Sequence, residues 1–195
     1  DRVVQIDPQG GRFGLGTIRA EADIHPDDWF LTCHFSDDNV MPGTLMYECC
    51  LHTLRIYLLR MGWVGESGTI VSEPVPGVTS GLKCRGQVTE KTRTVTYEIT
   101  LKEIGYRPEP FVIVDALMYA DGKPIVEIPD MSVRLAGLDR VKVEALWSEA
   151  GPDSPGTVRL TDVTAPRQVL YDYDKILAFS DGNPSEAFCE PYRIF

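Results

Sequence analysis

The sequence predicts an α+β domain in which one antiparallel sheet wraps around a single long, apolar helix. Residues 44–60 contain neither glycine nor proline, and apolar side chains occupy most sides of a helical wheel drawn for them. This pattern predicts a buried helix that ends at Gly62. Segments before and after it alternate polar and apolar residues, which is typical of strands. Because a lone apolar helix among twisted strands is buried only where the sheet curls around it, we expect a curled sheet.

Seven segments have the alternating pattern of strands, and Gly, Pro or Asp turns separate them. Two precede the predicted helix with Gly10 and Gly11 between them, and these two are expected to pair in antiparallel fashion. The irregular stretch between residues 26 and 43 lacks the pattern, and stretches of this kind often carry functional residues. In chain order the predicted strands are 1–7, 17–24, 69–71, 81–88, 93–102, 111–120 and 124–135.

The chain is expected to divide into three parts. Residues 1–138 form the predicted domain. Residues 139–168 are expected to be a linker, because 148–166 are rich in Gly, Pro, Ser, Asp and Thr. Residues 169–195 form a C-terminal segment in which 171–179 could make a short helix. That segment is either a tail that packs on the domain or the beginning of another folded unit.

The chain is acidic, with a formal net charge of −10 and a pI near 4.7. Nucleic acids and anionic membrane surfaces are therefore not expected as partners, because phosphate binding requires clustered Lys and Arg. No stretch approaches the ~20 apolar residues that cross a bilayer, and residues 1–20 lack a signal-peptide pattern. The five cysteines are an odd number without a C-x-x-C pair, which argues against a disulfide framework or a zinc knuckle. A soluble, cytoplasmic protein is expected.

One stretch combines residues that suit catalysis. His34 precedes a helix start at Pro42-Gly43, and Glu48 lies in the first turns of that helix. Pro42 fixes the entry angle and Gly43 allows close approach to the free N–H groups of the helix start, which could bind a thioester carbonyl oxygen. Neutral imidazole could act as a base, and a glutamic acid desolvated by apolar neighbours could donate a proton. From spacing alone, an ordinary strand-end histidine and a solvated helix glutamate explain the pattern equally well.

The run Cys33-His34-Phe35, followed by Val40-Met41-Pro42-Gly43 and by Glu48, resembles the signature of the 3-hydroxyacyl-acyl-carrier-protein dehydratases, H-F-x-G-x-P-V-M-P-G-x-L-x-x-(D/E). Cysteine before the histidine is typical of the 3-hydroxydecanoyl branch, and the similarity extends over residues 1–138. The resemblance implies a hot-dog fold and the conversion of 3-hydroxyacyl thioesters to trans-2-enoyl thioesters. It implies His34 as the catalytic histidine, Glu48 as the acid and Gly43 as the oxyanion-hole amide. Glutamate at this position resembles the non-isomerising branch and the dehydratase domains of polyunsaturated fatty-acid synthases.

The resemblance also implies partners. The substrate would be carried on the phosphopantetheine of an acyl carrier protein or carrier domain, and no other cofactor is expected. The histidine and the acid of this family come from two adjoining units, which implies a homodimer or an adjacent hot-dog repeat. Residues 173–188 resemble the lead-in of such a repeat, as in the tandem units of polyunsaturated fatty-acid synthases. Because carrier proteins are acidic, docking requires a local basic patch, for which the candidates are Arg55, Arg60, Lys83, Arg85 and Arg93.

Three positions depart from the family pattern. Asp37 replaces a glycine of the signature, and Asn39 replaces the proline before Val40. His52 stands where the family usually has glutamine, four residues after Glu48 and therefore on the same helix face. A metal ion held by these two side chains is not expected, because no further ligand cluster is visible. A hydrogen bond between His52 and Glu48 is favoured instead.

Apolar residues along the helix could line a channel for a fatty chain. Met41 and Tyr47 are the principal candidates, with Met46, Leu51 and Leu54, although core packing is the simpler explanation for most of them. Two other enzymes remain as alternatives, a hot-dog thioesterase and a dehydratase that also isomerises the double bond. A third alternative, motivated by Asp37 and Asn39, is a non-catalytic acyl-binding or structural unit of a megasynthase.

Overall fold

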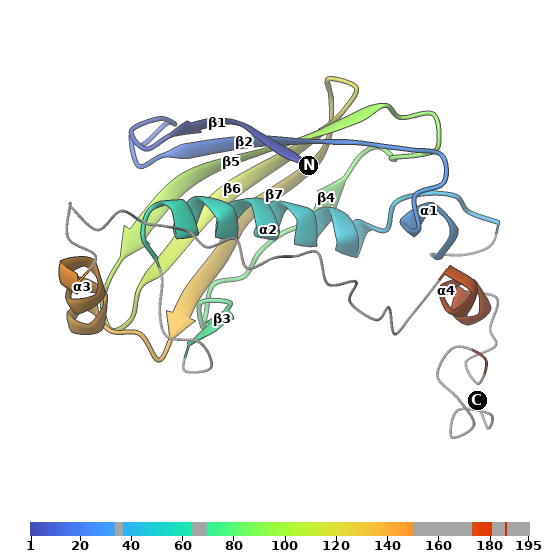
Figure 1. The fold of residues 1–195 in the computed structure, drawn as a ribbon. Helices are drawn as coiled ribbons and strands as arrows, with labels where there is room; N and C mark the ends of the chain where they lie inside the picture. Colours follow the sequence, from blue (N-terminus) through green and yellow to red (C-terminus); the bar gives the residue numbers. More distant parts are fainter. Residues whose placement is uncertain (34–36, 64–69, 150–172, 181–185, 187–195) are drawn as a thin grey trace.

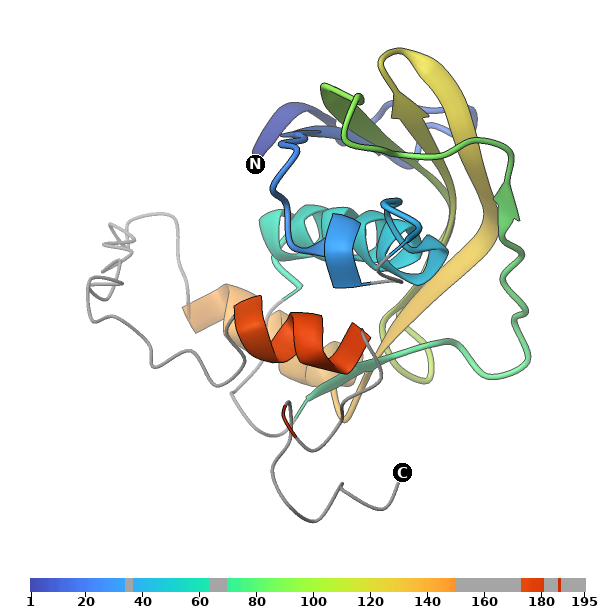
Figure 2. The same ribbon diagram turned by 90° about the vertical axis from the view of Figure 1, so that its right-hand side faces the viewer.

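The computed structural model describes residues 1–33, 37–63, 70–149, 173–180 and 186. It confirms the predicted fold class, because a curled antiparallel sheet wraps around one long helix, α2 (Gly43–Arg60), in a hot-dog fold (Figure 1, Figure 2). The strands are β1 (Arg2–Asp7), β2 (Thr17–Asp23), β3 (Val71–Glu73), β4 (Lys83–Cys84), β5 (Thr94–Gly105), β6 (Phe111–Ala120) and β7 (Lys123–Ala136). Their order in the sheet is β1-β2-β5-β6-β7-β3, with β4 paired to β7, and each of these pairs is antiparallel.

Most predicted strands agree with the observed ones. β6 has the predicted bounds, and β1, β2, β5 and β7 begin and end within a few residues of them. The strand predicted at 81–88 is wrong in length, since β4 comprises only Lys83–Cys84. Its pairing ends near Gly86, where a Cβ atom would lie 2.5 Å from Ile125 Cγ2. A further backbone hydrogen bond, from the Arg85 N–H to the Ile125 carbonyl oxygen at 2.7 Å, continues the contact with β7 up to this close approach.

α2 is buried on one side only. It begins after Pro42 and ends at Arg60, close to the prediction. Cys50, Leu54 and Tyr57 face the sheet and are at most 2% exposed. The opposite side is open, with Glu48, His52 and Leu59 exposed. More positions are thus exposed than the apolar helical wheel predicts.

The segment predicted to be a linker begins with a docked helix, α3 (Arg140–Glu149). Val143 of this helix is buried, as is the preceding Leu138. The indole Nε1 of Trp147 donates a hydrogen bond to the carbonyl oxygen of Gly62 at 2.7 Å, which ties α3 to the end of α2. The division of the whole chain into three parts stays a prediction.

The short helix expected at 171–179 is present as α4 (Tyr173–Ser180). It contacts α1 (Phe30–Cys33), the helix that precedes α2 in the chain, and the two views show them as neighbours (Figure 1, Figure 2). The described helix alone does not test the prediction that residues 169–195 begin a second repeat.

Gly16 lies just before β2, next to Tyr57 of α2. Its φ is +127°, and a Cβ atom there would overlap the hydroxyl group of the buried Tyr57. We expect Gly16→Ala to lower the free energy of unfolding by about 2–4 kcal/mol, because backbone strain adds to overpacking. Urea unfolding measures the change.

Gly77→Ala is the matched control for this substitution. Gly77 also has a positive φ, +80°, but nothing lies within 4 Å of the position of a Cβ atom. It should cost only about 1–2 kcal/mol, the conformational part of the effect. Equal losses in the two variants would contradict a tight contact between Gly16 and Tyr57.

Candidate functional site

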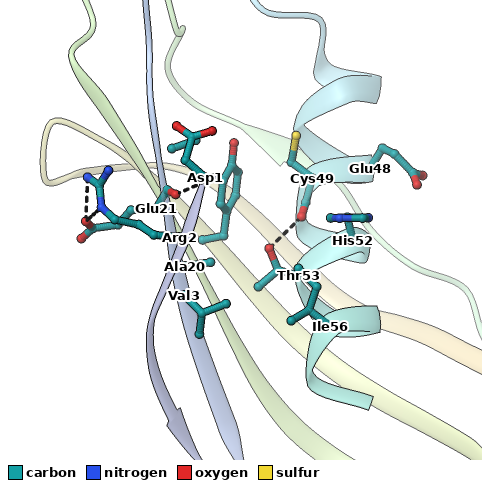
Figure 3. Close-up of a pocket in the computed structure, with 12 residues that line it drawn as sticks. Asp1, Arg2, Val3, Ala20, Glu21, Glu48, Cys49, His52, Thr53 and Ile56 are labelled. Atoms are coloured by element: carbon teal, nitrogen blue, oxygen red, sulfur yellow. Dashed lines mark hydrogen bonds and ion pairs between the residues drawn. The ribbon is translucent and has the colours of Figure 1, made fainter. Parts of the chain in front are cut away.

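A groove of about 560 Å³ lies between α2 and the β1–β2 edge of the sheet (Figure 3). Side chains of β1, β2 and β5 form one wall, and one flank of α2 forms the other. Figure 3 shows Val3 and Ala20 on the strand side, opposite Cys49, Thr53 and Ile56 on the helix side. The lining residues are Asp1, Arg2, Val3, Ala20, Glu21, Ala22, Glu48, Cys49, His52, Thr53, Ile56 and Tyr97.

Small residues on β2 explain why this space is open. Ile18 pairs with Ile99 of β5, and both are fully buried in the core. Ala20 and Ala22 lie on the same face of β2 as Ile18, because alternate residues of a strand share a face. Their single methyl groups leave room where isoleucines would fill it. The sheet therefore curls around α2 without closing on it at this edge.

Two titratable side chains, those of Tyr97 and Cys49, line the inner part of the groove. Tyr97 is only 6% exposed, and Cys49 is half-buried. Burial raises the pKa of both groups, so that both are neutral at physiological pH. The Thr53 hydroxyl donates a hydrogen bond to the Cys49 carbonyl oxygen at 2.9 Å. The inner part of the groove is thus largely apolar, and its two titratable groups carry no charge.

Glu48 lies at the mouth of the groove, on the open side of α2. Its side chain is 53% exposed, and its Oε1 accepts a hydrogen bond from Arg55 Nη1 at 3.0 Å. The expectation that apolar neighbours desolvate Glu48 is therefore wrong for this single unit. Arg55, expected only as part of a basic patch, is its ion-pair partner. A spacing of seven residues, two helical turns on one face, is the sequence signal for this pair.

His52 shares the groove mouth with Glu48 and is exposed. In the part of the chain that the structure describes, no hydrogen bond joins the two side chains, and Glu48 pairs with Arg55 instead. Among the described residues no group of three or more His, Cys, Asp or Glu side chains could hold a metal ion. Within the same ranges no helix is long and apolar enough to span a membrane.

Gly43 is the first residue of α2, so its N–H belongs to the helix-start groups that lack an intrahelical acceptor. Glu48 lies about 7.5 Å further along the helix axis and about 140° around it, from ideal helix geometry. The rise along the axis thus keeps these two groups beyond hydrogen-bond distance of each other within a single unit. His34 lies outside the described residues, and it follows α1 directly in the chain.

Met41 and Tyr47 are placed away from the groove. Met41 is only 4% exposed in the core, and Tyr47 is half-buried against the core. Neither lines the groove. A substrate-lining role for them stays a prediction, whereas the strand wall of the groove is formed by residues of β1, β2 and β5 that lie outside the signature.

The curled sheet, the enclosed helix and the groove beside it define a domain of the hot-dog type. The family model described as the FabA-like domain matches residues 1–129, and the chain belongs to this family. Hot-dog enzymes act on acyl thioesters, and family membership therefore supports chemistry of that general class.

Several solved structures resemble the chain at low identity. A hypothetical thioesterase with coenzyme A from Streptococcus pneumoniae TIGR4 is 9% identical over 63% of this chain and 80% of that chain, with a TM-score of 0.45. A hot-dog-like protein from Thermanaerovibrio acidaminovorans is 14% identical over 69% and 90%, with a TM-score of 0.44. A Streptococcus mutans UA159 protein bound to acetyl CoA is 10% identical over 64% and 84%, with a TM-score of 0.45. Likeness at this level supports no inference about the substrate.

The reactivity of the cysteines toward an alkylating reagent measures how well the sheet-facing side of α2 is buried. Burial raises the pKa of the Cys50 thiol to about 12, whereas Cys84 is exposed. Because the thiolate is the reactive form, we expect iodoacetamide at about pH 8 to alkylate Cys84 in the folded protein and to leave Cys50 unmodified. Even at about pH 10 the thiolate fraction of Cys50 should stay near 1%, since the raised pKa moves ionisation to higher pH.

Peptide mapping by mass spectrometry after a short labelling time measures this difference. Protein unfolded in urea is the control, in which both cysteines should react. Labelling of Cys50 as fast as Cys84 in the folded protein would contradict the burial of this face of α2.

Proposed function

We propose that this chain is a dehydratase unit that converts 3-hydroxyacyl thioesters, held on a carrier protein, to trans-2-enoyl thioesters. One observation carries the proposal. In a chain of the FabA-like family, the signature residue Gly43 opens α2, and Glu48 lies on the open side of the same helix beside a groove. The helix start supplies free N–H groups, and Glu48 supplies an accessible carboxyl group next to space for a substrate.

The elimination removes a proton from C2 and the hydroxyl group from C3. His34 takes the C2 proton, the electrons of that C–H bond form the C2=C3 double bond, and the C3–O bond breaks. The Gly43 N–H stabilises the negative charge that develops on the thioester oxygen. Glu48 gives the proton that converts the departing hydroxyl into water. A proton then passes from His34 to Glu48 through solvent, which restores both groups.

We propose that two units complete the site. Within one unit the Gly43 amide opens α2, whereas Glu48 lies about 7.5 Å further along the helix axis, from ideal helix geometry. Glu48 instead lies on the open side of the helix, where an adjoining unit can approach it. The second unit is a copy of this chain in a homodimer or an adjacent hot-dog repeat.

We propose that an acyl carrier protein docks beside the start of α2. Lys83 and Arg85 flank Cys84, whose sulfur lies 3.7 Å from the position of a Cβ atom at Gly43. Glu127 pairs with Lys83 at 3.3 Å and is 4.0 Å from Arg85, whose side chain is 73% exposed. Arg85 is therefore the freer cation for the phosphate of the pantetheine arm or for the acidic carrier surface.

Catalysis is tested with a 3-hydroxyacyl-pantetheine thioester, with loss of water followed by mass spectrometry. His34→Ala and Glu48→Gln should each slow dehydration at least about 100-fold, because each removes an acid–base group. In a homodimer, an equal mixture of the two variants after subunit exchange should recover about a quarter of the wild-type rate, since half the dimers then hold one intact site. His25→Ala, at an exposed loop position, is the matched control and should keep full activity.

The reaction products distinguish the proposed dehydratase from the alternative enzymes. Free hydroxy acid without the enoyl product would show a thioesterase, and a shifted double bond would show an isomerising enzyme. Unchanged turnover in His34→Ala would contradict the catalytic assignment. Absence of recovery in the mixture would exclude the homodimer and leave the adjacent repeat.

A further inference from the structure

We propose that a charged cluster on the outer face of the sheet positions the start of α2. The cluster consists of Lys102 on β5, Asp115 on β6 and Asp130 on β7. Asp115 alternates with buried residues of β6 and therefore points away from α2. Lys102 is thereby a positioning residue for the Gly43 amide, and this part of the proposal rests on the function proposed above. The cluster itself belongs neither to the signature nor to the groove.

The charged cluster joins three neighbouring strands where their pairing is irregular. Lys102 is the extra residue where the register between β5 and β6 shifts, between Leu101 and Glu103. Asp115 and Asp130 lie where the register between β6 and β7 shifts. Irregularities of this kind bend the strands that contain them. The three residues therefore mark a line of bulges across the sheet, which supports its curl around α2.

Hydrogen bonds hold these bulges together. Lys102 Nζ donates to Asp130 Oδ1 at 2.7 Å and to Asp115 Oδ1 at 3.0 Å. Asp115 Oδ1 also accepts a hydrogen bond from the Asp130 N–H at 3.2 Å. Asp130 has a φ of +58°, a left-handed conformation that costs free energy in residues other than glycine. Lys102 neutralises two carboxylates whose repulsion would otherwise oppose this conformation.

The segment that contains β4 is attached to β7 beside the charged cluster. The carbonyl oxygen of Pro129, next to Asp130, accepts a hydrogen bond from the Gly81 N–H at 3.1 Å. Further along β7, the Ile125 carbonyl oxygen accepts one from the Arg85 N–H at 2.7 Å. β4 is thus attached on both sides, and the first attachment lies one residue from the bulge at Asp130. A shift of β7 at this bulge would move that attachment.

The same segment packs against the start of α2. A Cβ atom at Gly43 would lie 3.7 Å from the sulfur of Cys84 and 4.0 Å from Cδ2 of Leu82, so both side chains border this residue. Figure 1 shows β4 near the end of α2 at which the helix starts. A shift of Leu82 and Cys84 would therefore change the direction of the Gly43 N–H. The charged cluster thus acts on this amide through β7 and β4.

Amide hydrogen exchange on the full, isotope-labelled chain, followed by NMR, tests the positioning without a substrate. In Lys102→Met the Gly81 N–H should exchange at least about tenfold faster, because the bulge beside its acceptor is no longer held. The Leu135 N–H, which donates to the Pro110 carbonyl oxygen at 2.9 Å elsewhere on β7, should change by less than about twofold. The chemical shift of the Gly43 N–H should move. Equal acceleration at both exchanging amides, or an unmoved Gly43 signal, would overturn the proposal.

Three further variants separate the role of the charge from a general loss of stability. Lys102→Arg keeps a cationic donor, and Gly81 exchange should stay within about twofold of the unchanged chain. Asp115→Ala removes the carboxylate that accepts two of the hydrogen bonds, and it should accelerate Gly81 exchange at least about fivefold. Lys142→Met is the matched control, because Lys142 Nζ donates to the Gly137 carbonyl oxygen at 3.0 Å in another part of the fold. It should leave Gly81 exchange unchanged.

Turnover tests the link to the reaction. In a chain that dehydrates 3-hydroxyacyl-pantetheine thioesters, Lys102→Met should lower kcat about tenfold and change KM by less than about twofold, because a displaced oxyanion donor weakens binding of the transition state. Lys102→Arg should restore kcat. Selective exchange with unaltered kcat would overturn the role of Lys102 as a positioning residue. Selective exchange in a chain that dehydrates no hydroxyacyl thioester would support the positioning of α2 and overturn the dehydratase instead.

Discussion

The packing of one side of α2 against the curled sheet is the contact on which the rest of the structure depends. Cys50, Leu54 and Tyr57 are at most 2% exposed, and the sheet residues that complete this core include Ile99 and Met131, both at 0%. Burial of one such side chain contributes about 1.5–3 kcal/mol. Because one helix fills the concave face of one sheet, the position of α2 against the sheet determines where the start of the helix, its open side and the adjacent groove lie.

The sequence predicts the elements whose signals are local. The alternation in β6 gives its observed bounds, and the apolar run without glycine or proline gives α2. The sequence does not predict α3, because the contacts that hold this helix are distant in the chain. Val143 is buried, and Trp147 donates a hydrogen bond to Gly62, 85 residues earlier. The length of β4 likewise depends on the close approach of a distant strand, which no local pattern encodes.

For the candidate site, the sequence locates residues but not their surroundings. Successive residues of a helix point about 100° apart, so Glu48 is 53% exposed although Met46 and Cys50, two positions away on either side, are at most 3% exposed. Sequence proximity therefore predicts the wrong environment for the carboxyl group. The sequence does not predict the groove either. The groove forms where the small side chain of Ala20 on β2 lies opposite α2, and these two elements come together only in the folded chain.

A second unit would change the environment of the side chains on the open side of α2. Arg55 extends beside a smaller apolar hollow of about 180 Å³, lined also by Leu59 and Trp63, and its guanidinium reaches Glu48. Within the described residues its Nε atom is buried without a hydrogen-bond partner. An adjoining unit that covered this side would remove water from the ion pair as well, and a desolvated pair is stable only when further hydrogen bonds satisfy both groups. The apolar environment that an acid donor needs would then come from the assembly of two units, because the fold of one unit leaves Glu48 in water.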